Sequence, residues 1–302
     1  MIYSVALSLL LGFELSFYLL IIQTGVVEHY NSNLFILFPM FVGGVAGTYF
    51  SGFSWIKITN PVHKAIIALV LQLFLSFLYP NYNFITLFLL GIAVGLMAPL
   101  GIYLFKAKQQ RELFFALAIA YTIGTYLFNL DANGRIYIAL VFSSITLLSA
   151  IVLRNYIVQT DSKTLSYGAS TYLPLMLWIL LDSNLFETLS RHEDINIWKN
   201  YTFIIIAFHI LGLVAAYFTK VSRAKQHSLI ALLFIFSYLF SYINLPILLA
   251  IVYPFVISYY NVVVFTTLAH EQSLKKLSFA MVFVGWIASG SGLAIALSRV
   301  LH

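Results

Sequence analysis

Long apolar runs follow one another along almost the whole chain, each separated from the next by a few polar residues. About twenty residues in a helix cross a bilayer, because ~30 Å of hydrocarbon is spanned at ~1.5 Å per residue. The pattern predicts an all-α, polytopic transmembrane helical bundle with eleven spans, at Ser4–Thr24, Leu34–Trp55, Val62–Tyr79, Phe84–Phe105, Leu113–Leu130, Ile136–Leu153, Thr171–Leu189, Tyr201–Thr219, Ser228–Ile243, Ile247–Ala269 and Leu277–Ser298.

Composition agrees with a membrane domain and excludes several functional classes. Of the 302 residues, 62% are hydrophobic and only 9% are charged, too little charge for a soluble domain of this size. The net charge of +6 is scattered over short loops, so it does not predict nucleic-acid binding. The chain has no cysteine, which excludes disulfides and thiolate metal sites.

Two carboxylates interrupt the apolar runs near the middle of a span. Glu14 lies in the first span and Asp182 in the seventh. A carboxylate at this depth costs roughly 3 kcal/mol or more when it faces lipid, so it is expected to face the inside of the bundle. We favour a substrate, ion or proton site over the alternative, a hydrogen-bonded acid that holds helices together.

The order of features after each acid indicates an internal repeat. Gly47 follows Glu14 in the next span, Gly212 follows Asp182 likewise, and each glycine precedes a basic loop, a histidine and an aromatic-rich helix end. Such an ordered series predicts two halves in parallel orientation. The predicted parts are a six-helix half, a connecting cytoplasmic loop and a five-helix half, at 1–154, 155–170 and 171–302.

Basic residues concentrate in alternate loops, beginning with the loop after the second span. These loops hold most of the 16 lysines and arginines, among them Lys57, Lys106, Lys108, Lys163 and Lys220. Because basic loops stay in the cytoplasm, the N-terminus is predicted to be cytoplasmic, in the plasma (inner) membrane. Eleven spans then place the C-terminus outside.

Three further residues are candidates for the same substrate or proton site. His209 lies at the centre of the eighth span, where it either assists the acids or is satisfied by a carbonyl or hydroxyl group. Tyr18 is one turn after Glu14 and shares its face. Asn184 lies beside Asp182 and could bond across helices.

The remaining charges bear on the kind of substrate. With two acids and no buried lysine or arginine expected, a cationic or proton-coupled neutral substrate is favoured over an anion. Glu187 and Arg191 are expected to form a solvated pair near the outer surface. A carboxylate with an imidazole could hold a divalent metal, so the metal question stays open. No cofactor is expected.

At this point the chain resembles the major facilitator superfamily of transporters. Six spans, a basic central loop and five more spans in parallel halves carry the resemblance. The family's loop motif, Gly-x-x-x-Asp-Arg-x-Gly-Arg-Arg, is not matched: from Gly47 the Asp and Arg positions are Ser51 and Gly52, and from Gly212 they are Ala216 and Tyr217. The twelfth span is also absent. The resemblance implies a cavity between two halves that opens alternately to either side.

The predicted function is therefore a secondary active transporter of a small solute or cation, compatible with proton coupling. The alternative from another class is a non-transporting membrane protein, such as an assembly factor or lipid-handling protein, on the same scaffold. An enzyme is not predicted. His270-Glu271 lacks the second histidine of a zinc-protease helix, because Leu274 occupies that position.

Overall fold

The computed structural model describes residues 1–30, 34–54, 58–105, 110–156, 169–191, 196–219, 221–271 and 273–300. Regular secondary structure within these residues is helical, and each of the eleven predicted spans coincides with a helix. The predicted all-α fold class is confirmed. The fourth span, Phe84–Phe105, has the predicted bounds at both ends.

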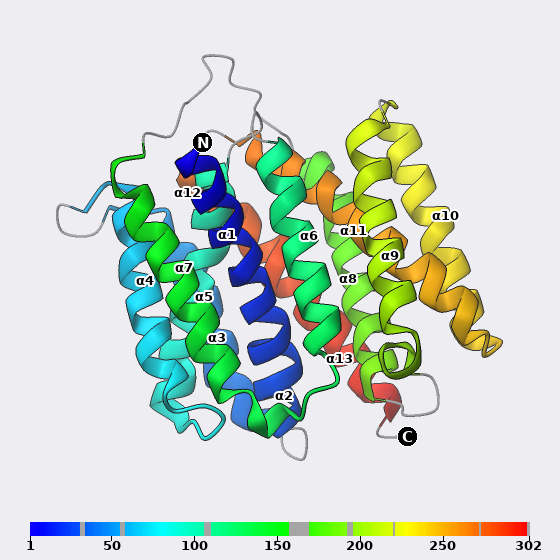
Figure 1. Ribbon diagram of the computed structural model, residues 1–302, viewed down its shortest axis with the longest axis horizontal. Coiled ribbons are helices and arrows are strands. Elements are labelled where there is room, and N and C mark those ends of the chain that lie inside the picture. The colour runs from blue at the N-terminus through cyan, green and yellow to red at the C-terminus, as the bar shows by residue number, and fades with distance from the viewer. Residues whose placement is uncertain are drawn as a thin grey trace. The chain divides into compact units, whose positions relative to one another are not determined.

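The first half of the chain forms the helices of the first six spans (Figure 1). The first span is continuous through three helical segments, since α1 passes into a π-helical stretch and then into the short α2. Their bounds are α1 (Ile2–Phe17), the π-helical Tyr18–Val26, α2 (Val27–His29), α3 (Phe38–Ser51), α4 (Pro61–Ser76), α5 (Phe84–Phe105), α6 (Gln110–Leu127) and α7 (Ile136–Val152).

The second half forms the helices of the remaining spans. Its last span is also interrupted by a π-helical stretch, at Val282–Ile287, which joins α12 to α13. The bounds are α8 (Ala169–Arg191), α9 (Ile197–Phe218), α10 (Arg223–Tyr242), α11 (Pro246–Ala269), α12 (Leu274–Met281) and α13 (Ala288–Val300).

Length and hydropathy identify the chain as an integral membrane protein. Among the described residues, seven helical segments are long and apolar enough to cross a membrane, and Phe35–Ser51 and Pro61–Ser76 are shorter apolar helices. Several helices begin at side-chain caps. The Asn60 side chain accepts a hydrogen bond from the Val62 amide at 2.9 Å, and Asn196 caps α9 in the same way.

The helices divide into two compact units. Unit 1 comprises Met1–Ser166 with Thr266–Val282, and unit 2 comprises Tyr167–Phe265 with Phe283–His302. The predicted connecting loop falls largely on residues 157–168, which lie outside the described residues, as do Lys57, Lys106, Lys108, Lys163 and Lys220.

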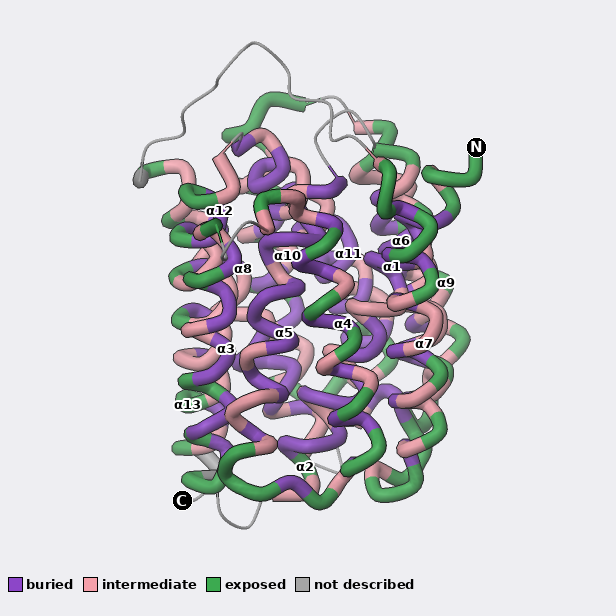
Figure 2. The backbone as a smooth tube through the Cα atoms, turned by 90° about the vertical axis from the view of Figure 1, so that its left-hand side faces the viewer, coloured by how far each residue is buried: buried purple, intermediate pink, exposed green. Residues whose placement is uncertain are grey.

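Close backbone contact between α3 and α5 forms the centre of unit 1. A Cβ atom added at Gly47 would overlap the backbone of Ile92, and one at Gly95 would overlap that of Gly44. The Thr48 hydroxyl donates to the Gly95 carbonyl at 2.8 Å. Figure 2 shows α5 as one of the most buried helices, in agreement with the fourteen buried residues among its twenty-two.

Unit 2 repeats this packing scheme. A Cβ at Gly212 of α9 would lie 2.5 Å from the Phe255 carbonyl oxygen of α11, so the second and fourth helices of each half meet at a glycine. The first and fifth helices of each half also meet at a glycine. Gly12 of α1 faces Ala116 of α6, and Gly292 of α13 faces Leu180 of α8. The structure therefore supports the repeat that the sequence predicted.

Candidate functional site

The first predicted acid, Glu14, lies on α1 inside unit 1. Its side chain is half-buried, and the Gln72 side chain of α4 donates a hydrogen bond from Nε2 to Glu14 Oε2 at 3.0 Å. Gln72 itself is fully buried. Within the described residues, its other amide atom, Oε1, has no hydrogen-bond partner. Glu14 is thus held by one neutral donor.

Polar side chains continue from Gln72 along α4 toward α7. The Ser76 hydroxyl donates to the Gln72 carbonyl at 2.8 Å and lies 2.9 Å from the Ser143 hydroxyl. Both serines are completely buried. They join α4 to α7 beside the acid. Tyr18, the predicted neighbour of Glu14, begins the π-helical stretch and packs against the apolar core of unit 1.

The second predicted acid, Asp182, lies on α8 inside unit 2. It is half-buried, and two tyrosines of α11 donate to its carboxylate, one to each oxygen. The Tyr253 hydroxyl is 2.8 Å from Oδ1, and the Tyr260 hydroxyl is 2.5 Å from Oδ2. Both tyrosines are buried. In the described part of the chain, no lysine, arginine or histidine is bonded to Asp182.

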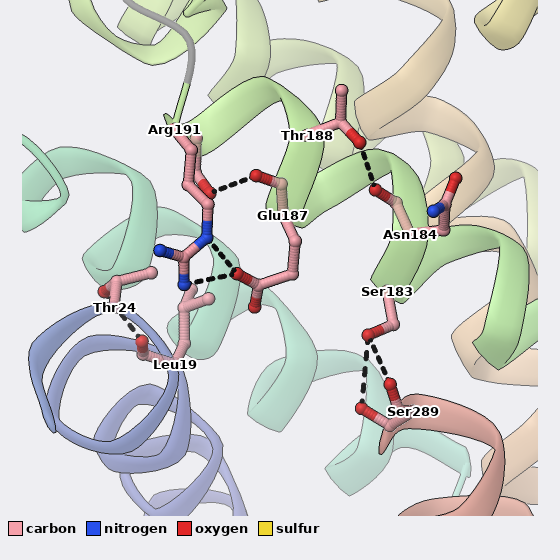
Figure 3. A network of polar contacts seen from close by, with 9 residues as sticks. Leu19, Thr24, Ser183, Asn184, Glu187, Thr188, Arg191 and Ser289 are labelled. Atoms are coloured by element: carbon pink, nitrogen blue, oxygen red, sulfur yellow. Dashed lines mark hydrogen bonds and ion pairs between the residues drawn. The ribbon is translucent and has the colours of Figure 1, made fainter. Parts of the chain in front are cut away.

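Asn184 joins three helices of unit 2. The Tyr238 hydroxyl of α10 donates to Asn184 Oδ1 at 2.9 Å, and Asn184 Nδ2 donates to the Gly292 carbonyl of α13 at 3.4 Å. The neighbouring Ser183 donates to the Ser289 carbonyl at 2.8 Å (Figure 3). Asn184 is buried at 4% exposure, so the bond across helices that the sequence allowed is present.

His209 of α9 is held against α11. Its Nδ1 lies 2.7 Å from the Ser258 hydroxyl, and the ring also bonds the backbone of Pro254. Ser258 also belongs to the close contact at Gly212, because a Cβ there would lie 3.0 Å from the Ser258 Cβ. Of the two alternatives that the sequence left open, this geometry matches a histidine that is satisfied by a hydroxyl and a backbone group.

The sequence prediction for Glu187 and Arg191 is half wrong. They do form an ion pair, with Arg191 Nη2 3.1 Å from Glu187 Oε2, and Figure 3 shows both guanidinium contacts to that oxygen. The pair is not solvated, however, since the side chains are only 4% and 10% exposed. The sequence pattern placed the Glu187 and Arg191 charges in water, but they are buried at the end of an apolar helix. Their pairing offsets the cost of desolvation.

The expectation that no lysine or arginine is buried is also wrong. Lys64 lies in the first turn of α4 at 3% exposure. Its Nζ donates to the carbonyls of Ser51 and Phe53, at 3.0 and 2.6 Å. These carbonyls end α3 and have no partner within that helix, so the lysine satisfies them.

Arg135 is the second buried cation, at 4% exposure. Its guanidinium donates to the carbonyls of Leu20 and Thr24 in the π-helical stretch, and to those of Phe128 and Leu130 after α6, at 2.7–3.3 Å. Burial lowers the pKa of Arg135. Both buried cations therefore lie at helix ends and bond backbone carbonyls, so neither serves as counterion to a mid-span acid.

Sequence reasoning missed the residues that hold the acids. Gln72, Tyr253 and Tyr260 were each read as ordinary span residues. One signal was available for the tyrosines, because a spacing of seven places both on one face of α11. The glutamine, a lone amide in an apolar span, was a second signal. Within the described residues no group of three or more His, Asp or Glu could hold a metal ion.

Comparison with known proteins identifies the fold. No family model matches the chain, and no curated protein matches its sequence. Among solved structures, it is similar to a crystal structure of a Major Facilitator Superfamily transporter, FucP, in the outward conformation, with a TM-score of 0.60 over 97% of this chain and 89% of that one. The fold is major facilitator-like. At 13% identity the similarity establishes the fold and leaves the activity to be argued from the site.

Proposed function

We propose that this protein is a secondary active transporter that moves a small solute or cation across the membrane by alternating access. One observation supports this most. The first helix of each unit carries a half-buried carboxylate in mid-span whose described polar partners are uncharged. A buried charge without a counterion is costly, so proteins keep one mainly where an ion, proton or substrate supplies the missing charge.

In this proposal Glu14 and Asp182 bind the transported cation or take up a proton. Occupancy biases the inward–outward equilibrium only by its difference in affinity for the two states. His209, Asn184 and Tyr18 support the helices around the acids. The protein lies in the plasma (inner) membrane with its N-terminus in the cytoplasm. A reporter fused after His302 should then be active only outside, and a cytoplasmic reporter signal there would contradict the orientation.

The function is tested with purified protein in liposomes on a solid-supported membrane, where addition of each solute from a panel of cations and neutral compounds is recorded as a current. The wild type should respond to at least one class of solute. Glu14→Gln and Asp182→Asn, which keep shape without ionising, should fold and lose the response. Normal currents from both variants at every pH tested would contradict the role of the two acids, whereas a wild type that gives no current with any solute would favour a non-transporting scaffold.

A further inference from the structure

The hydrogen bonds around Asp182 favour its charged form. Each oxygen of the carboxylate accepts a phenol hydroxyl, from Tyr253 or Tyr260, at 2.8 or 2.5 Å. Donors aimed at both oxygens favour the ionised form, and bonds to an ionised acceptor are about twice as strong as neutral ones. A proton on one oxygen would weaken the bond that this oxygen accepts, because a carboxylic acid is a weaker acceptor than a carboxylate. Unit 2 therefore contains a carboxylate whose hydrogen bonds favour its charged form and which has no described counterion.

Aromatic rings surround this charge. The Tyr260 ring lies 5.7 Å from that of Phe234, which stacks on Trp178 at 6.1 Å, and Trp178 precedes Asp182 by one helical turn. On the other side, Trp198 packs edge-on against Tyr253 at 6.4 Å. The negative face of an aromatic ring attracts an organic cation within about 6 Å, and the attraction strengthens when the pair is desolvated.

The same surroundings do not suit a metal ion. A bound metal takes several oxygen, nitrogen or sulfur ligands. Around Asp182 the described residues provide one carboxylate and two phenols, and His209 is bonded to Ser258 instead. An organic ammonium ion needs only the carboxylate as counterion and aromatic surface for its hydrocarbon part.

We propose that Asp182, with Tyr253 and Tyr260, binds an organic ammonium cation. This inference rests on the proposed transport function and names the class of its substrate. Asp182 is half-buried while both tyrosines are buried, so it is the most exposed of the three residues. The phenols orient it and favour its ionised form.

The test measures binding apart from transport. The full-length protein in detergent is titrated with methylammonium, phenethylamine or tetrabutylammonium, with 2-phenylethanol as the neutral counterpart of phenethylamine and sodium as the metal. At least one ammonium probe should raise the melting temperature with increasing concentration, since binding stabilises the folded state. 2-Phenylethanol and sodium should not.

Three variants locate the site. Asp182→Asn should abolish the shift, and Tyr260→Phe should weaken binding about tenfold or more, because a hydrogen bond to a charged group is lost. Tyr259→Phe is the matched control. It lies next to Tyr260, equally buried, and its hydroxyl has no partner among the described residues, so binding should be unchanged. If Asp182→Asn does not fold, the two tyrosine variants still decide.

Absence of a shift with all three ammonium probes would overturn the inference. So would equal binding of 2-phenylethanol, a shift with sodium alone, or equal effects of Tyr259→Phe and Tyr260→Phe. Failure of the transport proposal is distinguishable. Ammonium binding without any solute-driven current would leave this site standing and refute transport, whereas currents from neutral solutes without ammonium binding would refute only the site.

Discussion

Glu14 and Asp182 occupy corresponding places, in the first helix of each repeat, yet their hydrogen bonds differ. Glu14 accepts one bond, from a neutral amide, whereas Asp182 accepts two phenols, one on each oxygen. A proton can join Glu14 without displacing Gln72, because one carboxylate oxygen is not used by that bond. At Asp182 it would weaken a bond from a phenol, because both oxygens already accept one. The comparison teaches that the same place in two repeats can favour protonation of one acid and the charged form of the other.

The largest expected effect separates these two roles in transport. Glu14→Gln should reduce uphill accumulation driven by a pH gradient to the level of empty liposomes, because the proton carrier is lost. The Glu14→Gln variant should still exchange labelled for unlabelled substrate. The Asp182→Asn variant should show neither uphill accumulation nor exchange. Uptake and exchange by both variants are measured in the same liposomes. An Asp182→Asn variant that exchanges normally would show that the two roles are not divided in this way.

The next effect compares two acids on α8. Asp182 has no described counterion, whereas Glu187 is paired with Arg191 at 3.1 Å. Asp182→Asn removes a costly charge and should leave the melting temperature unchanged or raised. Glu187→Gln leaves Arg191 buried without its counterion and should cost roughly 1–3 kcal/mol. Thermal unfolding of both variants checks this, and a larger loss from Asp182→Asn would mean that Asp182 is structural.

Glycine substitutions test whether the two repeats are packed alike. Gly47→Ala and Gly212→Ala should each cost about 1–3 kcal/mol, because the added methyl group would overlap backbone of α5 or α11. Gly134→Ala is the control, since the nearest atom to its Cβ would be 4.0 Å away. Comparable melting temperatures for all three variants would contradict the close contacts.

The smallest effect concerns the partner of Glu14. Gln72→Leu removes the amide that donates to the carboxylate, so the neutral acid is favoured. The pH profile of transport should move to higher pH by up to about one unit, because a bond to a charged group is worth ~1.5 kcal/mol and one unit corresponds to ~1.4 kcal/mol. Transport rates over a pH series measure the shift, and a move to lower pH would show that Gln72 stabilises the neutral acid instead.

Sequence alone predicted the helices well and the site only in part. Hydrophobic length is a local property, so Phe84–Phe105 could be bounded from its own residues. The partners of the acids are distant in sequence, 58 residues for Gln72 and 71 and 78 for Tyr253 and Tyr260, and only folding brings them together.

Charges near helix ends were the least predictable. No buried lysine was expected because lysine is rarely buried, and the sequence does not show the backbone carbonyls near the end of α3 that the Lys64 ammonium group reaches. Arg135 is likewise buried against backbone carbonyls, since its guanidinium reaches those of Leu20 and Thr24 in the π-helical stretch of the first span. Charge counts along a sequence cannot show which backbone groups lack partners.

The division of roles between the acids is tested most directly by infrared difference spectroscopy of the protein in membranes as pH is lowered. Protonation of a buried carboxylate produces a carboxylic-acid C=O band that hydrogen–deuterium exchange identifies. The account predicts that the band of the wild type disappears in Glu14→Gln and persists in Asp182→Asn. A band that persists in Glu14→Gln and disappears in Asp182→Asn would contradict it.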